Sequence, residues 1–302
     1  MSSKSIEGDN DISVVINVWG KDSPHALRRS LRSIGNQTLN PSEVLIVIDG
    51  PINAQLEGEI AKFEVESSFE VRVIRVSVAT GLWNGRNVGI AEARNEIIAL
   101  HDADDLMHPE RLQIQIMEMK RLLADVCFTQ AMEFNTINEK IVTCRVYMHE
   151  VVDLNAIFWN NILSHSSAML KRKTIIEIGG YRNVYFSEDY DLWLRLIIAG
   201  KRVKQSKIVL QALGVDSGHV DRRGGFQFVK SENSIHRMIK DTQEFPSLTL
   251  LIRRILRLIY RLGPKLIRKT HRGRLTSRKT AAFPKTLTEF LDTKPVNCES
   301  HL

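Results

Sequence analysis

Three closely spaced carboxylates, Asp102, Asp104 and Asp105, are the side chains best placed to do chemistry in this chain of 302 residues. They follow the apolar residues 97–100, and Pro109 shortly after them suits the first turn of a helix. The apolar run predicts a buried strand, so the acids should lie at its carboxyl end, where open α/β sheets bind ligands. Clustered carboxylates repel one another unless a cation or a satisfied network compensates them. The pattern therefore favours a hard divalent cation that carries a phosphorylated ligand.

The same acids could instead cap the helix that begins near Pro109, because acids are favourable at the positive end of a helix dipole. One Asp would suffice for a cap, so three of them favour a ligand site. A second acidic pair, Glu188 and Asp189, precedes a segment with apolar residues at helical spacing. These two acids could cap that helix, or one of them could accept a proton as a general base.

Strand and helix patterns alternate over about the first 130 residues, and these elements must position the acids. Strands are predicted at 12–18, 44–48, 71–76 and 97–100, and helices at 24–35, 84–96 and 109–123. The alternation predicts βαβ units and a mainly parallel, Rossmann-like α/β sheet with helices on both faces. Farther along the chain, strands are predicted at 126–134, 141–147 and 203–210, and helices at 154–161, 171–178 and 189–199.

The formal net charge of +7 comes from one part of the chain. Residues 246–280 contain eleven Lys and Arg and no acid, so the remainder is mildly acidic. Within this segment, residues 248–269 predict an amphipathic helix. Its apolar stripe is formed by Leu251, Ile255, Leu258, Ile259 and Leu262, and its basic stripe by Arg254, Arg257, Arg261, Lys265 and Arg268. Such a helix can lie in a membrane interface with its cations on anionic head groups, or it can dock on the protein with a solvated basic face.

Length and composition allow one large domain with an appendage. We expect a flexible N-terminus at 1–11, the domain at 12–245, the basic amphipathic helical segment at 246–280 and a loosely ordered C-terminal tail at 281–302. The sequence has no apolar run long enough to span a membrane, and its polar N-terminus does not resemble a secretory signal. Three distant cysteines form neither a metal-ligand spacing nor a disulfide framework, which favours a reducing cytoplasm.

Five blocks of residues resemble the inverting glycosyltransferases of family 2, which have the GT-A fold. The closest likeness is to the members that build bacterial exopolysaccharide, capsule and lipopolysaccharide. The blocks follow the family's order, at 12–18 with 30–38, 47–51, 81–90, 102–105, and 179–181 with 187–195. An Asp-x-Asp triplet alone arises easily by chance, but here Arg86-Asn87 precedes it and Glu188-Asp189 follows it.

The resemblance implies a role for each acid. Asp104 would be the main ligand of Mn²⁺ or Mg²⁺, Asp102 would contact the donor ribose and the metal, and Asp105 would lie near the donor sugar or the acceptor. The metal would stabilise the departing diphosphate of a nucleotide-sugar donor as a Lewis acid. Asp189 would be the general base that takes the proton of the acceptor hydroxyl, with Glu188 beside it as a supporting acid.

Three further residues match family positions. Asp49 matches the residue that reads the donor nucleotide, although many relatives carry paired acids there and this chain has Ile48 before it. Arg86 would lie beside the donor diphosphate, the alternative being an ion pair with an acid. His219 would lie in a loop over the diphosphate as a third metal ligand, the alternative being an ordinary surface histidine.

The expected activity is metal-dependent, inverting transfer of one sugar from a nucleotide-sugar donor to a saccharide or lipid-linked acceptor. UDP is the commonest donor nucleotide among the relatives, and the Gln-x-x-Arg-Trp element of processive relatives is absent. We expect a cytoplasmic enzyme held peripherally on the inner face of the membrane, without a nucleic-acid partner. Two alternatives remain open: a sugar-phosphate nucleotidyltransferase, and a catalytically inactive, membrane-docked assembly protein.

Overall fold

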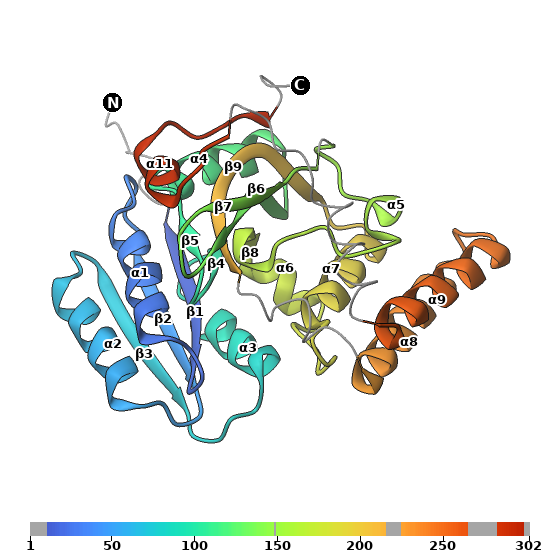
Figure 1. Ribbon diagram of the computed structural model, residues 1–302, viewed down its shortest axis with the longest axis horizontal. Coiled ribbons are helices and arrows are strands. Elements are labelled where there is room, and N and C mark those ends of the chain that lie inside the picture. Colours follow the sequence, from blue (N-terminus) through green and yellow to red (C-terminus); the bar gives the residue numbers. More distant parts are fainter. Residues whose placement is uncertain (1–10, 148, 216–224, 265–282, 299–302) are drawn as a thin grey trace, which may run out of the picture.

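The computed structural model describes residues 11–147, 149–215, 225–264 and 283–298 (Figure 1). Nine strands of this part form one curled sheet in the order β3-β2-β1-β4-β8-β6-β9-β5, with β7 paired to β6. The strands are β1 Ile12–Trp19, β2 Glu43–Asp49, β3 Glu70–Val76, β4 Ile97–Asp102, β5 Leu106–Met107, β6 Val126–Asn135, β7 Ile141–Arg145, β8 Met169–Lys171 and β9 Val203–Val215. Strands β3, β2, β1 and β4 are parallel, as are β6 and β9, so the prediction of a mainly parallel α/β sheet is confirmed.

Helices cover both faces of this sheet because the strands point apolar side chains to both sides. On one face lie α1 Pro24–Gly35, α2 Ala54–Glu66 and α4 Arg111–Arg121, and their Leu and Ile side chains pack against β1, β2 and β4. On the other face lie α3 Leu82–Glu92, α6 Arg172–Glu177, α7 Glu188–Ile198 and α8 Phe226–Asp241. Figure 1 shows these two groups on opposite sides of the strands.

Several elements differ from the sequence-based expectation. Helices α2 and α8 and strands β5 and β8 were not predicted. The predicted helix at 84–96 ends at Glu92, since Ala93 is extended and the Arg94 amide donates to buried Glu43 at 2.7 Å. The predicted helix at 154–161 is the single turn α5, Leu154–Ile157. At the end of this turn the carbonyl oxygens of Ile157 and Phe158 accept hydrogen bonds from Tyr190 and Arg253 instead of continuing the helix.

The amphipathic helix predicted at 248–269 is α9, Ser247–Leu262, and it ends earlier than expected because Gly263 is extended and Pro264 follows it. Its orientation is the reverse of the predicted one. Arg257 and Arg261 of the basic stripe point inward, and together with Arg253 they surround Glu232 of α8. Glu232 Oε1 lies 3.0 Å from Arg257 Nε and 2.9 Å from Arg261 Nε. The interpretation that these two cations face head groups or water is therefore wrong; Lys265 and Arg268 lie outside the described residues.

The apolar stripe of α9 faces outward as a consequence. Leu251, Ile255, Ile259 and Leu262 are each about half exposed, whereas Arg253 is completely buried. Burial raises the pKa of the Glu232 carboxyl, but the adjacent Arg257 and Arg261 outweigh this effect and lower the pKa to about 2. The buried ion cluster thus fixes which side of α9 contacts the protein, because each of its charges would be left unpaired by rotation of the helix.

The C-terminal residues 283–298 are packed, contrary to the expected loose tail. They contain α11, Leu287–Asp292, whose Phe290 is buried against the His108 ring at a centroid distance of 5.3 Å. Asn297 forms an isolated bridge with Ile208 of β9. Within the described ranges, none of the helices is long and apolar enough to cross a membrane.

Candidate active site

The predicted acids lie at one edge of the sheet, where the parallel strands β1, β2 and β4 end. Asp49 at the end of β2 pairs in register with Trp19 of β1, and Asp102 at the end of β4 pairs with Asn17. Asp104 in the following turn is exposed, whereas the Asp102 side chain is 31% exposed. The Ser30 hydroxyl of α1 donates to the Asp102 carbonyl at 3.1 Å and so fixes the start of this turn. The edge is the one at which parallel sheets bind ligands.

Helix α3 brings Arg86 close to this edge because two glycines let the helix lie directly on the sheet. A Cβ atom on Gly85 would overlap the side-chain amide of Asn17, and one on Gly89 would overlap Val15. Arg86 is consequently buried, with only 6% of its surface exposed. The sequence alone could not reveal this depth, since Arg at the start of a helix is usually solvated.

Arg86 joins the two acidic groups that lie far apart in the sequence. Its Nη1 lies 2.7 Å from Glu188 Oε1, and its Nη2 lies 3.5 Å from Asp102 Oδ1. Glu188 and Asp189 are the first two residues of α7, where acids favour the helix dipole. The structure therefore brings the Asp-x-Asp turn and the Glu-Asp pair together in one place.

The electrostatics of this link follow from burial and charge. Burial acts to lower the pKa of Arg86, but Asp102 and Glu188 outweigh it and raise that pKa above its ordinary value. Burial acts to raise the pKa of Asp102, but His165 and Arg86 outweigh it and lower the pKa. The pKa of Glu188 is raised, because burial and the neighbouring Asp189 prevail over the Arg86 charge. Asp102 is thus a firmly ionised carboxylate, while Glu188 is held closer to neutrality.

A histidine and a tyrosine complete the surroundings of Asp102. His165 Nδ1 lies 3.3 Å from Asp102 Oδ1, and His165 Nε2 lies 3.0 Å from the Tyr181 hydroxyl. The Arg86 guanidinium lies over the Tyr181 ring, 5.6 Å from its centroid. Asn87 fixes the Tyr181 backbone through two hydrogen bonds, of 2.9 Å to the carbonyl and 2.8 Å from the amide.

Asp189 has its own set of partners. Its Oδ2 accepts a hydrogen bond of 2.9 Å from the Asn161 amide, and its Oδ1 accepts one of 2.7 Å from the Tyr190 backbone amide. Both donors are neutral, so the carboxylate is oriented without being paired to a cation by these bonds. Asp189 also acts electrostatically on Arg86 and on Tyr181, which places its charge in the same group of side chains.

Negative charge accumulates around the Asp-x-Asp turn. Asp22, in the loop after β1, has its pKa raised to about 7 by burial and by the charges of Asp104 and Asp102, against the hydrogen bond from Trp19. Burial and the charges of Asp104 and Asp102 also raise the pKa of Asp105 well above its usual range. Burial is the larger cause of both shifts, and the charges of Asp102 and Asp104 add to it. A divalent cation would relieve the excess.

The residues fit such a cation in the way that Mg²⁺ or Mn²⁺ binds together with a substrate. The described residues contain no group of three or more His, Cys, Asp or Glu side chains arranged as a complete metal site. A cation that carries a diphosphate commonly uses only one or two protein carboxylates, with phosphate oxygens and waters as the other ligands. The carboxylates of Asp102 and Asp104 are hard oxygen donors that could hold such a cation.

Two predicted donor contacts are engaged within the protein. Asp49 is buried, and its two oxygens accept hydrogen bonds from the backbone amides of Thr80 and Gly81 at 2.8 and 2.9 Å. Asp105 is buried too, with hydrogen bonds from the Ser166 hydroxyl and, at 2.9 Å, from the Gly214 amide. Asp49 thereby holds the loop before α3, and Asp105 ties the Asp-x-Asp turn to β9. The nucleotide-reading role of Asp49 and the sugar-side role of Asp105 stay predictions, and His219 lies outside the described residues.

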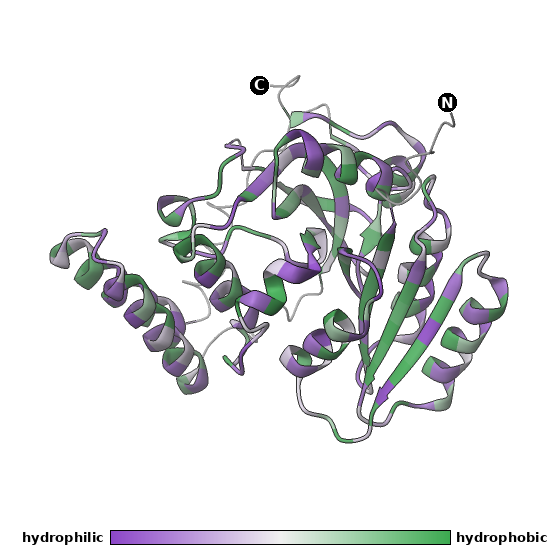
Figure 2. Cartoon of the chain, turned by 180° about the vertical axis from the view of Figure 1, so that it is seen from behind, coloured by the Kyte–Doolittle hydropathy of each residue, from purple (hydrophilic) through white to green (hydrophobic). Residues whose placement is uncertain are grey.

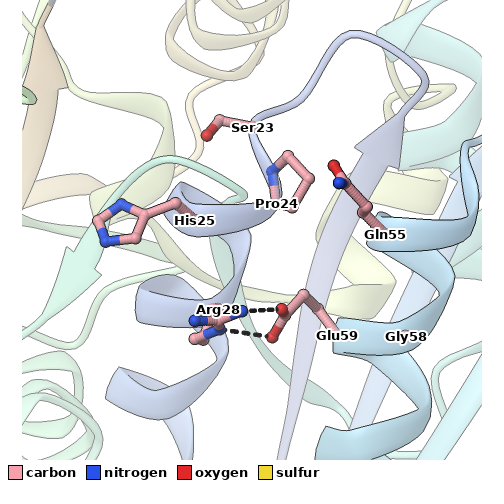
Figure 3. Close-up of a pocket in the computed structure, with 7 residues that line it drawn as sticks. All are labelled: Ser23, Pro24, His25, Arg28, Gln55, Gly58 and Glu59. Carbon is pink, nitrogen blue, oxygen red and sulfur yellow. Dashed lines mark hydrogen bonds and ion pairs between the residues drawn. The ribbon is translucent and has the colours of Figure 1, made fainter.

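Sequence-based reasoning assigned no role to Asp22, Asn161 or Tyr181. The signal for Asp22 was its place in the loop after the first strand, since loops at the carboxyl ends of adjacent parallel strands converge. A separate hollow of about 530 Å³ lies between the first turns of α1 and α2 (Figure 3). Its wall contains an ion pair between Arg28 and Glu59, and none of the site residues described above lines it.

Comparisons with known proteins show to which family the chain belongs. The family model described as "Glycosyl transferase family 2" matches residues 13–189. The amylovoran biosynthesis glycosyltransferase AmsE of Erwinia amylovora is 27% identical over 228 residues, which cover 75% of this chain and 84% of the relative. The UDP-Gal:alpha-D-GlcNAc-diphosphoundecaprenol beta-1,3-galactosyltransferase of Escherichia coli is 26% identical over 228 residues, covering 73% of this chain and 80% of the relative.

Solved structures support the fold. The crystal structure of S. aureus TarS 1–349 in complex with UDP-GlcNAc superposes with a TM-score of 0.64 and 16% identity, covering 82% of this chain and 72% of that chain. The same fragment in complex with UDP gives a TM-score of 0.62 at 16% identity, over 89% and 76% of the two chains. At this identity the likeness concerns the fold alone, which is the predicted GT-A type.

Proposed function

The chain belongs to glycosyl transferase family 2 and is therefore a glycosyltransferase; we propose that it catalyses metal-dependent, inverting transfer of one sugar from a nucleotide-sugar donor to a saccharide or lipid-linked acceptor. The product would be a bacterial cell-surface polysaccharide, which agrees with the names of the two curated relatives. Family membership decides against the alternative of a sugar-phosphate nucleotidyltransferase.

The observation that carries this proposal is the contact of Arg86 with both acidic groups. Because Asp102 and Glu188 lie on the two sides of one guanidinium, a donor bound at the Asp-x-Asp turn would have its sugar near the start of α7. An acceptor hydroxyl could then approach the anomeric carbon from the side of Asp189, opposite to the leaving nucleotide. This opposed arrangement is what an inverting single displacement requires.

The donor end would be bound at the strand edge. Asp104 and Asp102 would hold Mn²⁺ or Mg²⁺, which stabilises negative charge on the departing diphosphate as a Lewis acid. Arg86 would contact the diphosphate or the sugar from the side of helix α3. Because Arg86 is buried, its charge would act in surroundings of low dielectric constant. The donor is proposed to be UDP-linked, in line with the UDP-sugar named for the Escherichia coli relative. Asp49 would line the nucleotide end through the loop that it holds.

The acceptor end would be deprotonated by Asp189. Its carboxylate is oriented by Asn161 and by the Tyr190 amide, and it can take the hydroxyl proton as the new glycosidic bond forms. Glu188 is engaged by Arg86, so its role would be to position that guanidinium and to contact the acceptor. His165 would hold the Asp102 carboxylate in place through its Nδ1 atom.

The acceptor class and the cellular location belong to the same proposal. A lipid-linked saccharide, as in the name of the Escherichia coli relative, is presented at a membrane surface. We place the enzyme on the inner, cytoplasmic face of that membrane, held peripherally through the region of residues 248–269. An anionic membrane would suit the seven Lys and Arg of residues 265–280, since Arg253, Arg257 and Arg261 are engaged by Glu232.

The test is hydrolysis of a panel of nucleotide sugars by the purified chain, with and without Mn²⁺. We expect slow, Mn²⁺-stimulated release of a nucleoside diphosphate from one donor, abolished by Asp104→Ala. Pyrophosphate formation from a sugar 1-phosphate and a nucleoside triphosphate would contradict the proposal. Normal glycan synthesis in cells whose only copy carries Asp189→Asn would indicate the non-catalytic, assembly role instead.

A further inference from the structure

Helix α9 presents a continuous apolar face that nothing in the described part of the chain covers. Seven aliphatic side chains on this face are between 43% and 68% exposed: Leu248, Leu251, Ile252, Ile255, Leu256, Ile259 and Leu262. Figures 1 and 2 show α9 at one end of the molecule, remote from α2 and β3. A contiguous patch of this kind on a soluble domain marks an interaction surface, in contrast to isolated exposed Leu or Ile residues.

Contacts on the opposite side of α9 keep this apolar face turned away from the protein. Arg253 Nε donates to the Phe158 carbonyl at 2.6 Å, and Arg257 and Arg261 hold Glu232. If α9 rolled over to bury its Leu and Ile side chains, these four charged groups would lose their partners. The exposed apolar face is therefore a stable feature of the fold.

The composition of the apolar face favours a lipid bilayer, and not another protein, as its partner. It contains only Leu and Ile, and α9 as a whole contains no acid. Protein interfaces are typically enriched in aromatic residues and Arg and have polar groups that need partners, whereas a bilayer requires apolar area alone. The neighbouring sequence 265–280 adds seven Lys and Arg and no acid, which complements anionic lipid head groups.

The inward side of α9 contacts aromatic residues close to the start of α7. The Arg261 guanidinium lies 4.7 Å from the centroid of the Phe228 ring in α8, and Phe186 stacks on that ring at 5.6 Å. Phe186 is 61% exposed and lies two residues before Glu188, and Phe226 at the start of α8 is 85% exposed. Exposed aromatic rings suit the interfacial zone of a bilayer. The Gly225 amide donates to the Arg261 carbonyl at 3.1 Å, so exposed aromatic rings lie close both to the end of α9 and to the start of α7.

We propose that this face, formed by the seven aliphatic side chains of α9 together with Phe226 and Phe186, inserts into the interfacial layer of a lipid bilayer. The inserted part is the aliphatic side of the helix, while Arg253, Arg257 and Arg261 act inside the protein. The proposal rests on the proposed function only for its purpose, which is to bring the start of α7 to a lipid-linked acceptor. The vesicle binding itself requires no activity.

The test is flotation of the full-length chain with phosphatidylcholine vesicles that contain one quarter phosphatidylglycerol. The variant Ile252→Gln/Ile255→Gln/Ile259→Gln removes the centre of the face without touching the ion cluster. The matched control, Val65→Gln/Met117→Gln/Ile176→Gln, changes three apolar residues on α2, α4 and α6 that are at least as exposed. We expect the α9 variant to bind vesicles at least about tenfold more weakly than the wild type, and the control to bind normally.

Three results would overturn the proposal: no binding by the wild type, equal binding by the α9 variant, or a dimer in light scattering that the α9 variant dissociates. The last result would identify a second copy of the chain as the occupant. Hydrolysis of nucleotide sugars in solution, measured on the same proteins, should be unchanged in both variants. A chain that floats with vesicles but hydrolyses no nucleotide sugar would contradict the proposed function and leave the membrane surface intact.

Discussion

Replacing Asp189 by Asn separates catalysis from folding more cleanly than any other change at the site. The structural cost follows from the two hydrogen bonds that the carboxylate accepts. In the variant, the remaining side-chain oxygen can still accept from the Tyr190 amide, but the introduced NH₂ group would face the amide nitrogen of Asn161, which lies 2.9 Å from the present carboxylate oxygen. One hydrogen bond is therefore lost, and the free energy of unfolding should fall by only about 1 kcal/mol.

The catalytic cost is much larger. Without a carboxylate to accept the hydroxyl proton, kcat should fall by about 10²–10⁴-fold, the usual contribution of a positioned general base. This loss corresponds to about 3–5 kcal/mol in the activation barrier, well above the change in stability. Donor binding should be unaffected, because Asp189 lies at the acceptor end of the proposed site.

The assay is transfer or hydrolysis kinetics with the donor found in the nucleotide-sugar panel, alongside chemical denaturation of the same proteins. Asn161→Ala is the control, since it removes this hydrogen bond, together with the one that Asn161 accepts from the Leu163 amide at 3.1 Å, and retains the carboxylate. We expect this control to lose at least as much stability but far less activity. If Asp189→Asn retained the wild-type kcat, or if Asn161→Ala were equally inactive, the assignment of the base would be refuted.

Three further predictions concern charges near the site and in the buried ion cluster. Asp104→Ala should abolish Mn²⁺-stimulated nucleotide binding and leave the fold intact, because the side chain is exposed; a nucleotide titration that is unaltered in Mn²⁺ would contradict the metal assignment. Asp22→Asn should raise the melting temperature in metal-free buffer at pH 8 but not near pH 4. The pKa of Asp22 is about 7 in the folded chain and lower in the unfolded chain, so the wild type loses stability as the pH rises toward 7. Thermal melts of both proteins at pH 4 and at pH 8 test this prediction, and a gain in melting temperature that does not depend on pH would contradict it. Glu232→Ala should lower the free energy of unfolding by about 3–5 kcal/mol, because it leaves buried arginines unpaired. In the wild type the folded pKa of Glu232, about 2, lies below the unfolded value, so this contribution is present above about pH 4.5 and is lost as the pH falls toward 2; denaturation at pH 7, with exposed Glu244→Ala as the control, measures it.

Periodicity and turn residues predicted those elements whose signals are local. The strands β1, β2 and β4 are mostly apolar, and α1 begins at a proline after Ser23, which caps the helix through its side chain. Strands β5 and β8 have only two and three residues, and their strand character depends on pairing with distant β9, β4 and β6. No local pattern can specify such pairing.

The candidate site was predictable in its acids but not in its connections. The Asp-x-Asp and Glu-Asp blocks could be read directly, whereas the ion pair of Arg86 with Glu188 spans 102 positions in the sequence. The burial of Arg86 depends on the close approach of Gly85 and Gly89 to β1, which is a property of the packed structure. Tyr181 and Asn161 contribute through single contacts that leave no repeating pattern.

Helix α9 shows a different limit. Its spacing correctly predicts two faces, but an amphipathic pattern does not state which face is turned inward. Basic residues normally point to water, and here a single buried carboxylate on another helix, Glu232, draws three of them inward. The outcome could be inferred only with α8 in place, and α8 itself was not predicted.

The charge balance at the strand edge explains why a cation and Arg86 are both needed for the proposed reaction. The charges of Asp102 and Asp104 add to the effect of burial, which raises the pKa of Asp22 to about 7 and the pKa of Asp105 well above its usual range. A donor diphosphate would bring further negative charge to the same edge, which is unfavourable unless a positive charge arrives with it. Arg86 cannot supply all of it, because its guanidinium is shared between Asp102 and Glu188. Donor affinity should therefore depend steeply on the divalent cation, and removing that cation should weaken nucleotide binding more than replacing Arg86 with Lys.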